Sequence, residues 1–176
     1  MAVAKASQPD FRTAWQLPLN PLDTAFADFP NVGYYAPFPY FFQAAVFRAL
    51  LVFECRPMLL FYAMRLATLA VWLALVMAAL RLVPFHQRSM AWLALLPSSL
   101  FLHASLTGDA VTNGLCFWLL AALLSLIFTE KKMAETPRWL KAGIFISSAM
   151  IALSKPVYFP LVLLVWLARQ SPPANT

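Results

Sequence analysis

Residues 58–80 restrict the fold of this chain more than any other feature, because they are apolar apart from one charge, Arg65. A helix of this length reaches about 35 Å at about 1.5 Å per residue, which exceeds the roughly 30 Å hydrocarbon core of a bilayer. An apolar stretch of this length is typical of a transmembrane helix. The stretch therefore predicts a helix that crosses a membrane.

The rest of the chain extends this prediction from one span to several. Of its 176 residues, 62% are hydrophobic and 11% are charged, and the mean hydropathy is +0.71. These values lie outside the usual range of soluble globular domains. The last apolar block is too long for one untilted span, and Ser154-Lys155-Pro156 interrupts it. We therefore predict an all-α, polytopic transmembrane helical bundle with spans at about 58–80, 89–106, 110–128, 139–154 and 156–168.

The segments that flank these spans differ in character. Residues 1–37 contain several prolines and show no helical period, which predicts an extracytoplasmic, loop-like segment. Residues 38–54 are apolar but reach only about 25 Å and contain Arg48, so they form either a marginal span or a juxtamembrane helix. We assign residues 38–170 to one membrane helical domain and residues 171–176 to a tail.

An excess of basic residues sets the expected orientation. The chain has 13 Lys and Arg against 7 Asp and Glu, a formal net charge of +6. It lacks a basic stripe punctuated by aromatic residues, so we expect no nucleic-acid partner and attribute the excess to the positive-inside rule. One set of connections carries Arg81, Arg88, Lys131, Lys132, Arg138, Lys141 and Arg169, and the opposite set carries Arg56, Asp109 and Lys155. We therefore expect a multi-pass protein of the inner (cytoplasmic) membrane with Asp109 and Lys155 on its extracytoplasmic face.

The cysteines and histidines predict no metal site. Cys55 and Cys116 lack a Cys-x-x-Cys spacing, and His86 and His103 lack a partner at the spacings of known zinc motifs. A divalent metal held by a carboxylate is left open as a cofactor.

Asp109 is one of few acidic residues in the chain and lies between two expected spans, in the sequence SLTGDAVTNGL. Its residue type and its position directly before a helix fit a helix N-cap, where a carboxylate accepts from free backbone N–H groups. An acidic group at a membrane surface can also act as a general base or hold a divalent metal on a phosphate. Both interpretations stay open on the sequence alone.

Two cations are expected near the same membrane face. Lys155 precedes Pro156 at the interruption of the last apolar block, where it either snorkels to the interface or binds an anionic group. Arg65 lies about two turns inside a span, where an arginine needs water, a carboxylate or a phosphate. Together with Asp109, these residues have the chemistry needed to bind a lipid phosphate or pyrophosphate.

Four motifs, in order, resemble a bacterial family of predicted multi-pass membrane proteins, domain of unknown function 2142. The motifs are YYAPFPYFFQAAVFRAL, MRLATL, LALLPSSLFLHASLTGDAVTNGL and IALSKPVYFPLVLL, and the resemblance covers about residues 34–168. That family looks related to the GT-C class of membrane glycosyltransferases, which implies a partial GT-C-like fold. The most specific elements of this resemblance are the Ser-x-x-x-Asp stretch that ends at Asp109 and the Lys155-Pro156 turn.

The resemblance implies a hexosyltransferase that uses a polyprenyl-phosphate-linked sugar at the extracytoplasmic face. Asp109 would be its acidic residue, acting as base or metal contact, and Lys155 and Arg65 would bind the carrier phosphate. Asp10, in Pro9-Asp10-Phe11-Arg12, is the nearest match to an acidic motif of the first outer loop, without the Glu and His of that motif. The expected partners are membrane lipids, including the polyprenyl-phosphate sugar.

The sequence also departs from the pattern of that class. No apolar helix precedes residue 38, and the chain ends soon after residue 168, whereas the family continues through further spans. These departures lead us to expect an incomplete fragment of a longer enzyme. The alternative is a non-catalytic multi-pass membrane subunit or scaffold in cell-envelope assembly, in which Asp109 only caps a helix.

Overall fold

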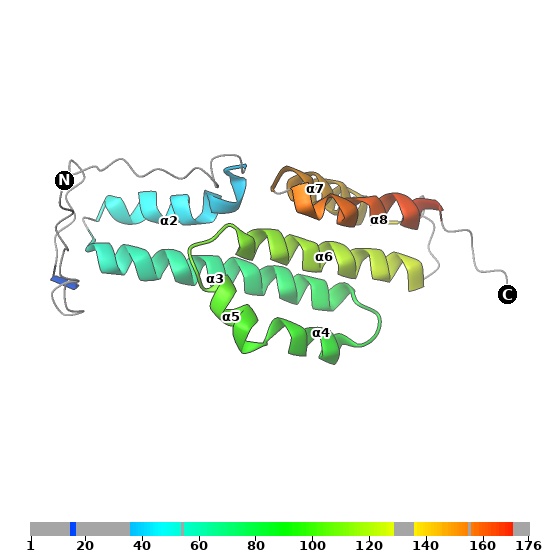
Figure 1. The fold of residues 1–176 in the computed structure, drawn as a ribbon, viewed down its shortest axis with the longest axis horizontal. Helices are drawn as coiled ribbons and strands as arrows, with labels where there is room; N and C mark the ends of the chain where they lie inside the picture. The colour runs from blue at the N-terminus through cyan, green and yellow to red at the C-terminus, as the bar shows by residue number, and fades with distance from the viewer. Residues whose placement is uncertain (1–14, 17–35, 54, 129–135, 155, 171–176) are drawn as a thin grey trace, which may run out of the picture.

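The structure is a computed structural model that describes residues 15–16, 36–53, 55–128, 136–154 and 156–170. Within these residues all regular structure is helical, which confirms the all-α prediction for this part of the chain. The helices lie side by side in an elongated bundle (Figure 1). Most of the predicted loop-like segment 1–37, and the whole of the predicted tail 171–176, lie outside the described residues.

The elements follow one another along the chain with short connections. They are η1 (Phe38–Tyr40), α2 (Phe41–Leu51), α3 (Pro57–Leu82), α4 (Gln87–Ala94), α5 (Pro97–His103), α6 (Asp109–Phe128), α7 (Arg138–Ser154), η3 (Pro156–Tyr158) and α8 (Phe159–Gln170).

Helices α3 and α6 form the centre of the bundle and share its most extensive contact. Both are long and apolar enough to cross a membrane. Ala110, at the start of α6, packs with Trp72 and Val76, whereas Ala121, further along α6, packs with Ala79 and Val83. Later residues of α6 therefore contact later residues of α3, so the two helices run parallel. Alanine at the contact allows their backbones to approach closely.

The segment between α3 and α6 runs back along them as two short helices, which differs from the single span predicted at 89–106. Helix α4 ends at Ala94 and α5 begins at Pro97, whose ring provides no N–H to continue the helical hydrogen bonds. At its far end, α5 is held to α3 by the stacked rings of His103 and Trp72. Apolar composition did not reveal this break, because membrane helices tolerate proline when neighbouring groups satisfy the freed backbone.

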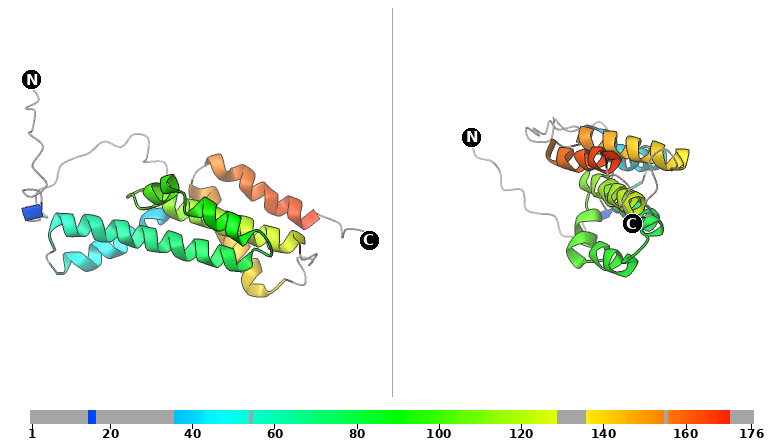
Figure 2. Two further views of the ribbon diagram at one scale, coloured as in Figure 1. Left: turned by 90° about the horizontal axis from the view of Figure 1, so that it is seen from below. Right: turned by 90° about the vertical axis from the view of Figure 1, so that its right-hand side faces the viewer.

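Helices α2, α7 and α8 lie on the side of α3 and α6 that faces away from α4 and α5 (Figure 2). The predicted juxtamembrane segment 38–54 forms η1 and α2, and α2 lies against the first half of α3. Helices α7 and α8 pack on α6 around a core that includes Leu119, Leu123 and Ile144. Helix α7 ends at Ser154, so the predicted spans 139–154 and 156–168 correspond to two helices joined by a turn beside α6.

Large apolar side chains cover much of the outer surface of the bundle. Trp92 and Phe101 are each 75% exposed, and Phe145 is 63% exposed. Exposed apolar surface on this scale is typical of lipid contact and is unfavourable in water. Together with the two membrane-length helices, it supports a membrane location.

Four basic residues lie together at one end of the bundle. Arg81 is in the last turn of α3, Arg88 is in the first turn of α4, and Arg138 and Lys141 are in the first turn of α7. These helix ends lie opposite the end where α6 begins with Asp109 (Figure 1). We call the first the basic end and the second the polar end.

Candidate functional site

Polar side chains meet at the polar end, where α5 ends, α6 begins and α7 gives way to η3. They come from segments far apart in the sequence and are linked mainly by hydrogen bonds. We call this group the polar cluster; it comprises Gln43, Arg65, Thr68, His103, Asp109, Thr112, Asn113, Ser154 and Tyr158.

Arg65 is the member of the polar cluster that ties α3 to α5. Its Nε donates to the carbonyl oxygen of Ala104 at 2.6 Å, and its guanidinium carbon lies 5.4 Å from the ring centre of Phe61. Ala104 is the C-cap of α5, whose terminal carbonyl groups have no partner within the helix. The predicted need of Arg65 for a polar partner is thus met in part by a helix end, at the start of the loop that leads to Asp109.

Gln43 ties α2 to the same place. Its Nε2 donates to Thr68 Oγ1 at 3.0 Å and to the carbonyl oxygen of Thr107 at 3.3 Å. Thr68 in turn donates to the carbonyl oxygen of Met64 at 2.8 Å. Gln43 is buried, so these bonds spare its amide the cost of lying in an apolar environment without partners. The sequence analysis missed this residue, although a single glutamine in an apolar run was the available signal.

Gly108 allows η1 to pack directly against the loop before α6. A Cβ atom at this position would lie 2.9 Å from the Cβ of Pro39 and 3.3 Å from Cζ of Tyr40. A contact of 2.9 Å is too short for two carbon atoms, so any larger residue would push η1 away. The aromatic segment around Tyr40 is therefore a neighbour of the turn that carries Asp109.

Asp109 is the first residue of α6 and is half-buried. The carbonyl oxygen of Gly108 accepts from the backbone N–H of Thr112 at 3.3 Å and from its hydroxyl at 3.2 Å. Gly108 therefore takes the cap position, and the sequence-based N-cap interpretation of Asp109 is displaced by one residue. A carboxylate in the first turn still interacts favourably with the positive end of the helix dipole.

His103 is the buried centre of the polar cluster. Its Nδ1 lies 2.6 Å from the carbonyl oxygen of Ser99, and its Nε2 lies 3.2 Å from Nδ2 of Asn113. The hydroxyl of Tyr158 donates to Oδ1 of Asn113 at 3.1 Å. The ring stacks on Trp72, with 4.4 Å between ring centres and 12° between planes. Neither His103 nor its partners were predicted as site residues, because a lone histidine in an apolar segment has no motif around it.

The turn after α7 lies beside the start of α6 through two contacts. The hydroxyls of Ser154 and Thr112 are 3.2 Å apart, and Tyr158 binds Asn113 as described above. These residues flank Lys155 in the sequence. The predicted site residues Lys155 and Asp10 both lie outside the described residues.

The polar cluster is set back from the start of α3. Arg65 is eight residues after Pro57, which corresponds to about 12 Å along a helix. Beyond this level the central helix α3 continues with α2 against it, whereas α5 ends and α6 begins here (Figure 1). Backbone groups at helix ends need polar partners, and Arg65 and Gln43 provide two of them.

Comparison with known protein families assigns the chain. The family described as predicted membrane protein (DUF2142) matches residues 4–174, which include the whole polar cluster. The chain belongs to the DUF2142 family. No curated protein and no solved structure matches it. The family supports the membrane location, so any activity of this DUF2142 protein has to be argued from the polar cluster itself.

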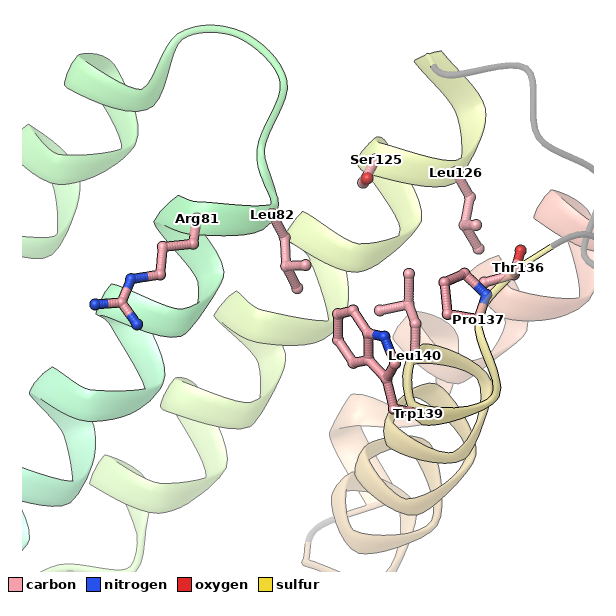
Figure 3. A pocket seen from close by; sticks show the side chains of 8 residues that line it. All are labelled: Arg81, Leu82, Ser125, Leu126, Thr136, Pro137, Trp139 and Leu140. Atoms are coloured by element: carbon pink, nitrogen blue, oxygen red, sulfur yellow. The ribbon is translucent and has the colours of Figure 1, made fainter.

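The basic end of the DUF2142 protein contains a cavity of about 220 Å³ (Figure 3). It lies where α3 and α6 end and α7 begins, and it is lined by Arg81, Leu82, Ser125, Leu126, Thr136, Pro137, Trp139 and Leu140. The guanidinium group of Arg81 points away from the other lining side chains. Among the described residues, no three His, Cys, Asp or Glu side chains group together as metal ligands. The polar end, where side chains from several helices converge, is the better candidate for a functional site.

Proposed function

We propose that the chain crosses the membrane at least three times. Helices α3 and α6 are parallel, and two parallel spans require the chain to return across the bilayer between them. The α4–α5 segment provides that return, because it runs back along α3 from Met90, beside Val83, to His103, beside Trp72. The basic end faces the cytoplasm by the positive-inside rule, which leaves the polar end towards the extracytoplasmic side of the inner membrane.

We propose that the polar end binds a polyprenyl-phosphate-linked sugar, as in a GT-C-type membrane glycosyltransferase. The observation that supports this most is the convergence of Arg65, the turn that carries Asp109, and the residues that flank Lys155. Arg65 uses Nε for Ala104, and within the described residues its terminal nitrogens have no hydrogen bond, so they are suited to a phosphate. In this proposal Lys155 and Arg65 bind the carrier phosphate, and Asp109 acts as general base or as contact to a divalent metal.

Replacement of Asp109 by Asn tests this proposal. Asparagine keeps the shape of the side chain but removes the negative charge needed for a base or a metal contact. We expect Asp109→Asn to abolish transfer of a labelled sugar from a polyprenyl-phosphate sugar in native membranes, with unchanged membrane insertion. Thr107→Val, in the same loop, is the matched control and should retain transfer. Full transfer by Asp109→Asn would reject the catalytic role of Asp109.

The alternative function is a non-catalytic membrane subunit or scaffold in cell-envelope assembly. One observation favours it: among the described residues, every buried side-chain nitrogen and oxygen has a hydrogen-bond partner. Such a cluster is stable without a ligand. This alternative predicts that polyprenyl phosphate does not bind to the purified protein, and that Asp109→Asn has no effect beyond a small change in stability.

A further inference from the structure

In the hydrogen bonds that link Tyr158, Asn113, His103 and Ser99, the donor and the acceptor of each bond can be assigned. A carbonyl oxygen can only accept, so the contact with Ser99 requires the proton of His103 on Nδ1. Nε2 is then an acceptor, and the amide nitrogen of Asn113 donates to it. The amide oxygen of Asn113 accepts from the Tyr158 hydroxyl. Tyr158 therefore donates to Asn113, Asn113 to His103, and His103 to Ser99. This sequence of donors and acceptors requires a neutral imidazole with its proton on Nδ1.

Packing keeps this chain of hydrogen bonds in place. His103 is only 5% exposed and Trp72 only 2% exposed, and their rings are stacked. Rotation of the imidazole out of its present plane would lose the stacking on Trp72 and both ring hydrogen bonds together. The half-buried amide of Asn113 is held between two partners of opposite kind, so it too has one favoured orientation.

This chain of hydrogen bonds connects the start of α6, which contains Asp109, with the segment that follows Lys155 in the sequence. The proposed function assigns the acidic role to Asp109 and phosphate binding to Lys155. Asn113 is four residues after Asp109, so the two lie on one face of α6. Tyr158 is three residues after Lys155, in the turn between α7 and α8. A shift of Tyr158 against Asn113 would therefore move this turn relative to the start of α6.

We propose that His103, Asn113 and Tyr158 are positioning residues. They fix η3, which leads from α7 into α8, against the first turn of α6, which begins with Asp109. The meaning of this placement for catalysis rests on the proposed function, but the hydrogen-bond chain does not.

Nitrogen NMR of the histidine rings tests which ring nitrogen of His103 carries the proton, and so which groups donate in this chain of hydrogen bonds. The protein has two histidines, so His86→Gln, at an exposed site, leaves His103 as the only one. We expect His103 labelled with nitrogen-15 to carry its proton on Nδ1 and none on Nε2. Asn113→Asp offers a carboxylate that can only accept, so Nε2 should then also carry a proton, while Nδ1 keeps its proton for the carbonyl oxygen of Ser99. A wild-type proton on Nε2, or an unchanged spectrum in Asn113→Asp, would overturn the proposal.

A distance measurement tests the positioning itself. Spin labels at Val157 and Leu66, which are 81% and 66% exposed, report the place of the turn relative to α3. We expect Tyr158→Phe and Asn113→Leu to broaden the distance distribution. Ser147→Ala is the matched control, because the Ser147 hydroxyl donates within α7 and should leave the distance unchanged. Unbroadened distances in Tyr158→Phe, which removes only one oxygen, would refute positioning even if Asn113→Leu failed to fold.

Neither measurement needs a substrate, so the two proposals fail separately. Absent sugar transfer with His103 in the expected tautomer would reject the glycosyltransferase alone. Normal transfer in variants that lose the hydrogen-bond chain would reject the positioning role alone.

Discussion

The polar and basic ends of the bundle are formed by the same apolar helices, yet they hold their polar groups in different ways. At the polar end, hydrogen bonds join segments distant in the sequence, such as Gln43 with Thr68 and Thr112 with Ser154. At the basic end the side chain of Gln87 donates to the carbonyl oxygen of Val83, four residues earlier, across the short loop between α3 and α4. The hydrogen bonds of the polar end thus join segments far apart in the sequence, whereas that of Gln87 joins neighbouring residues.

This difference follows from burial. A buried polar group without a partner is destabilising, so the polar end needs an arrangement in which each group meets a partner from another helix. Arg81 and Arg88 at the basic end are exposed and reach headgroups or water without such an arrangement. Substitutions at the polar end should therefore disturb several helices, and those at the basic end should stay local.

The largest expected effect is at Trp72, which supports the stacked ring of His103. Trp72→Ala removes a side chain that is 2% exposed and should lower the free energy of unfolding by about 3–5 kcal/mol. Trp92→Ala removes the same side chain from an exposed site and should change it by less than about 0.5 kcal/mol. Denaturant unfolding in detergent micelles measures both. Equal losses in the two variants would contradict the placement of Trp72 in the core.

A smaller loss is expected where η1 packs on the loop before α6. Gly108→Ala places a methyl group 2.9 Å from Pro39, and should destabilise the protein by about 1–3 kcal/mol. Hydrogen exchange of η1 and α2 should increase with it, because these elements have to move away. Wild-type exchange and stability would show that the close approach is absent.

The smallest effect compares one glutamine at each end. Gln43→Leu leaves the carbonyl oxygen of Thr107 without its amide donor, and should lower the free energy of unfolding by about 1–2 kcal/mol. Gln87→Leu removes one partly buried bond across the short loop from α3 to α4, and should cost only about 0.5 kcal/mol. Similar losses in both variants would erase the contrast between the ends.

The sequence predicted the helices better than their partners. Residues 58–80 and 110–128 were identified by length and apolar character, and they correspond to α3 and α6. The break at Pro97 was missed, because its flanks are as apolar as the rest of the segment. Of the residues of the polar cluster, Arg65 and Asp109 were predicted as site residues from their charge. Gln43, His103 and Asn113 were not, because single neutral polar residues carry no pattern.

The sequence by itself determined that this chain is helical and suited to a membrane, since apolar length and the distribution of basic residues act through the bilayer and need no tertiary contact. Only the tertiary structure decided that α3 and α6 pack directly against each other and that Arg65 reaches the end of α5. It also decided that Asn113 links His103 to Tyr158. The reason is physical: hydrogen bonds between distant segments depend on how helices pack, and many packings share the same apolar pattern.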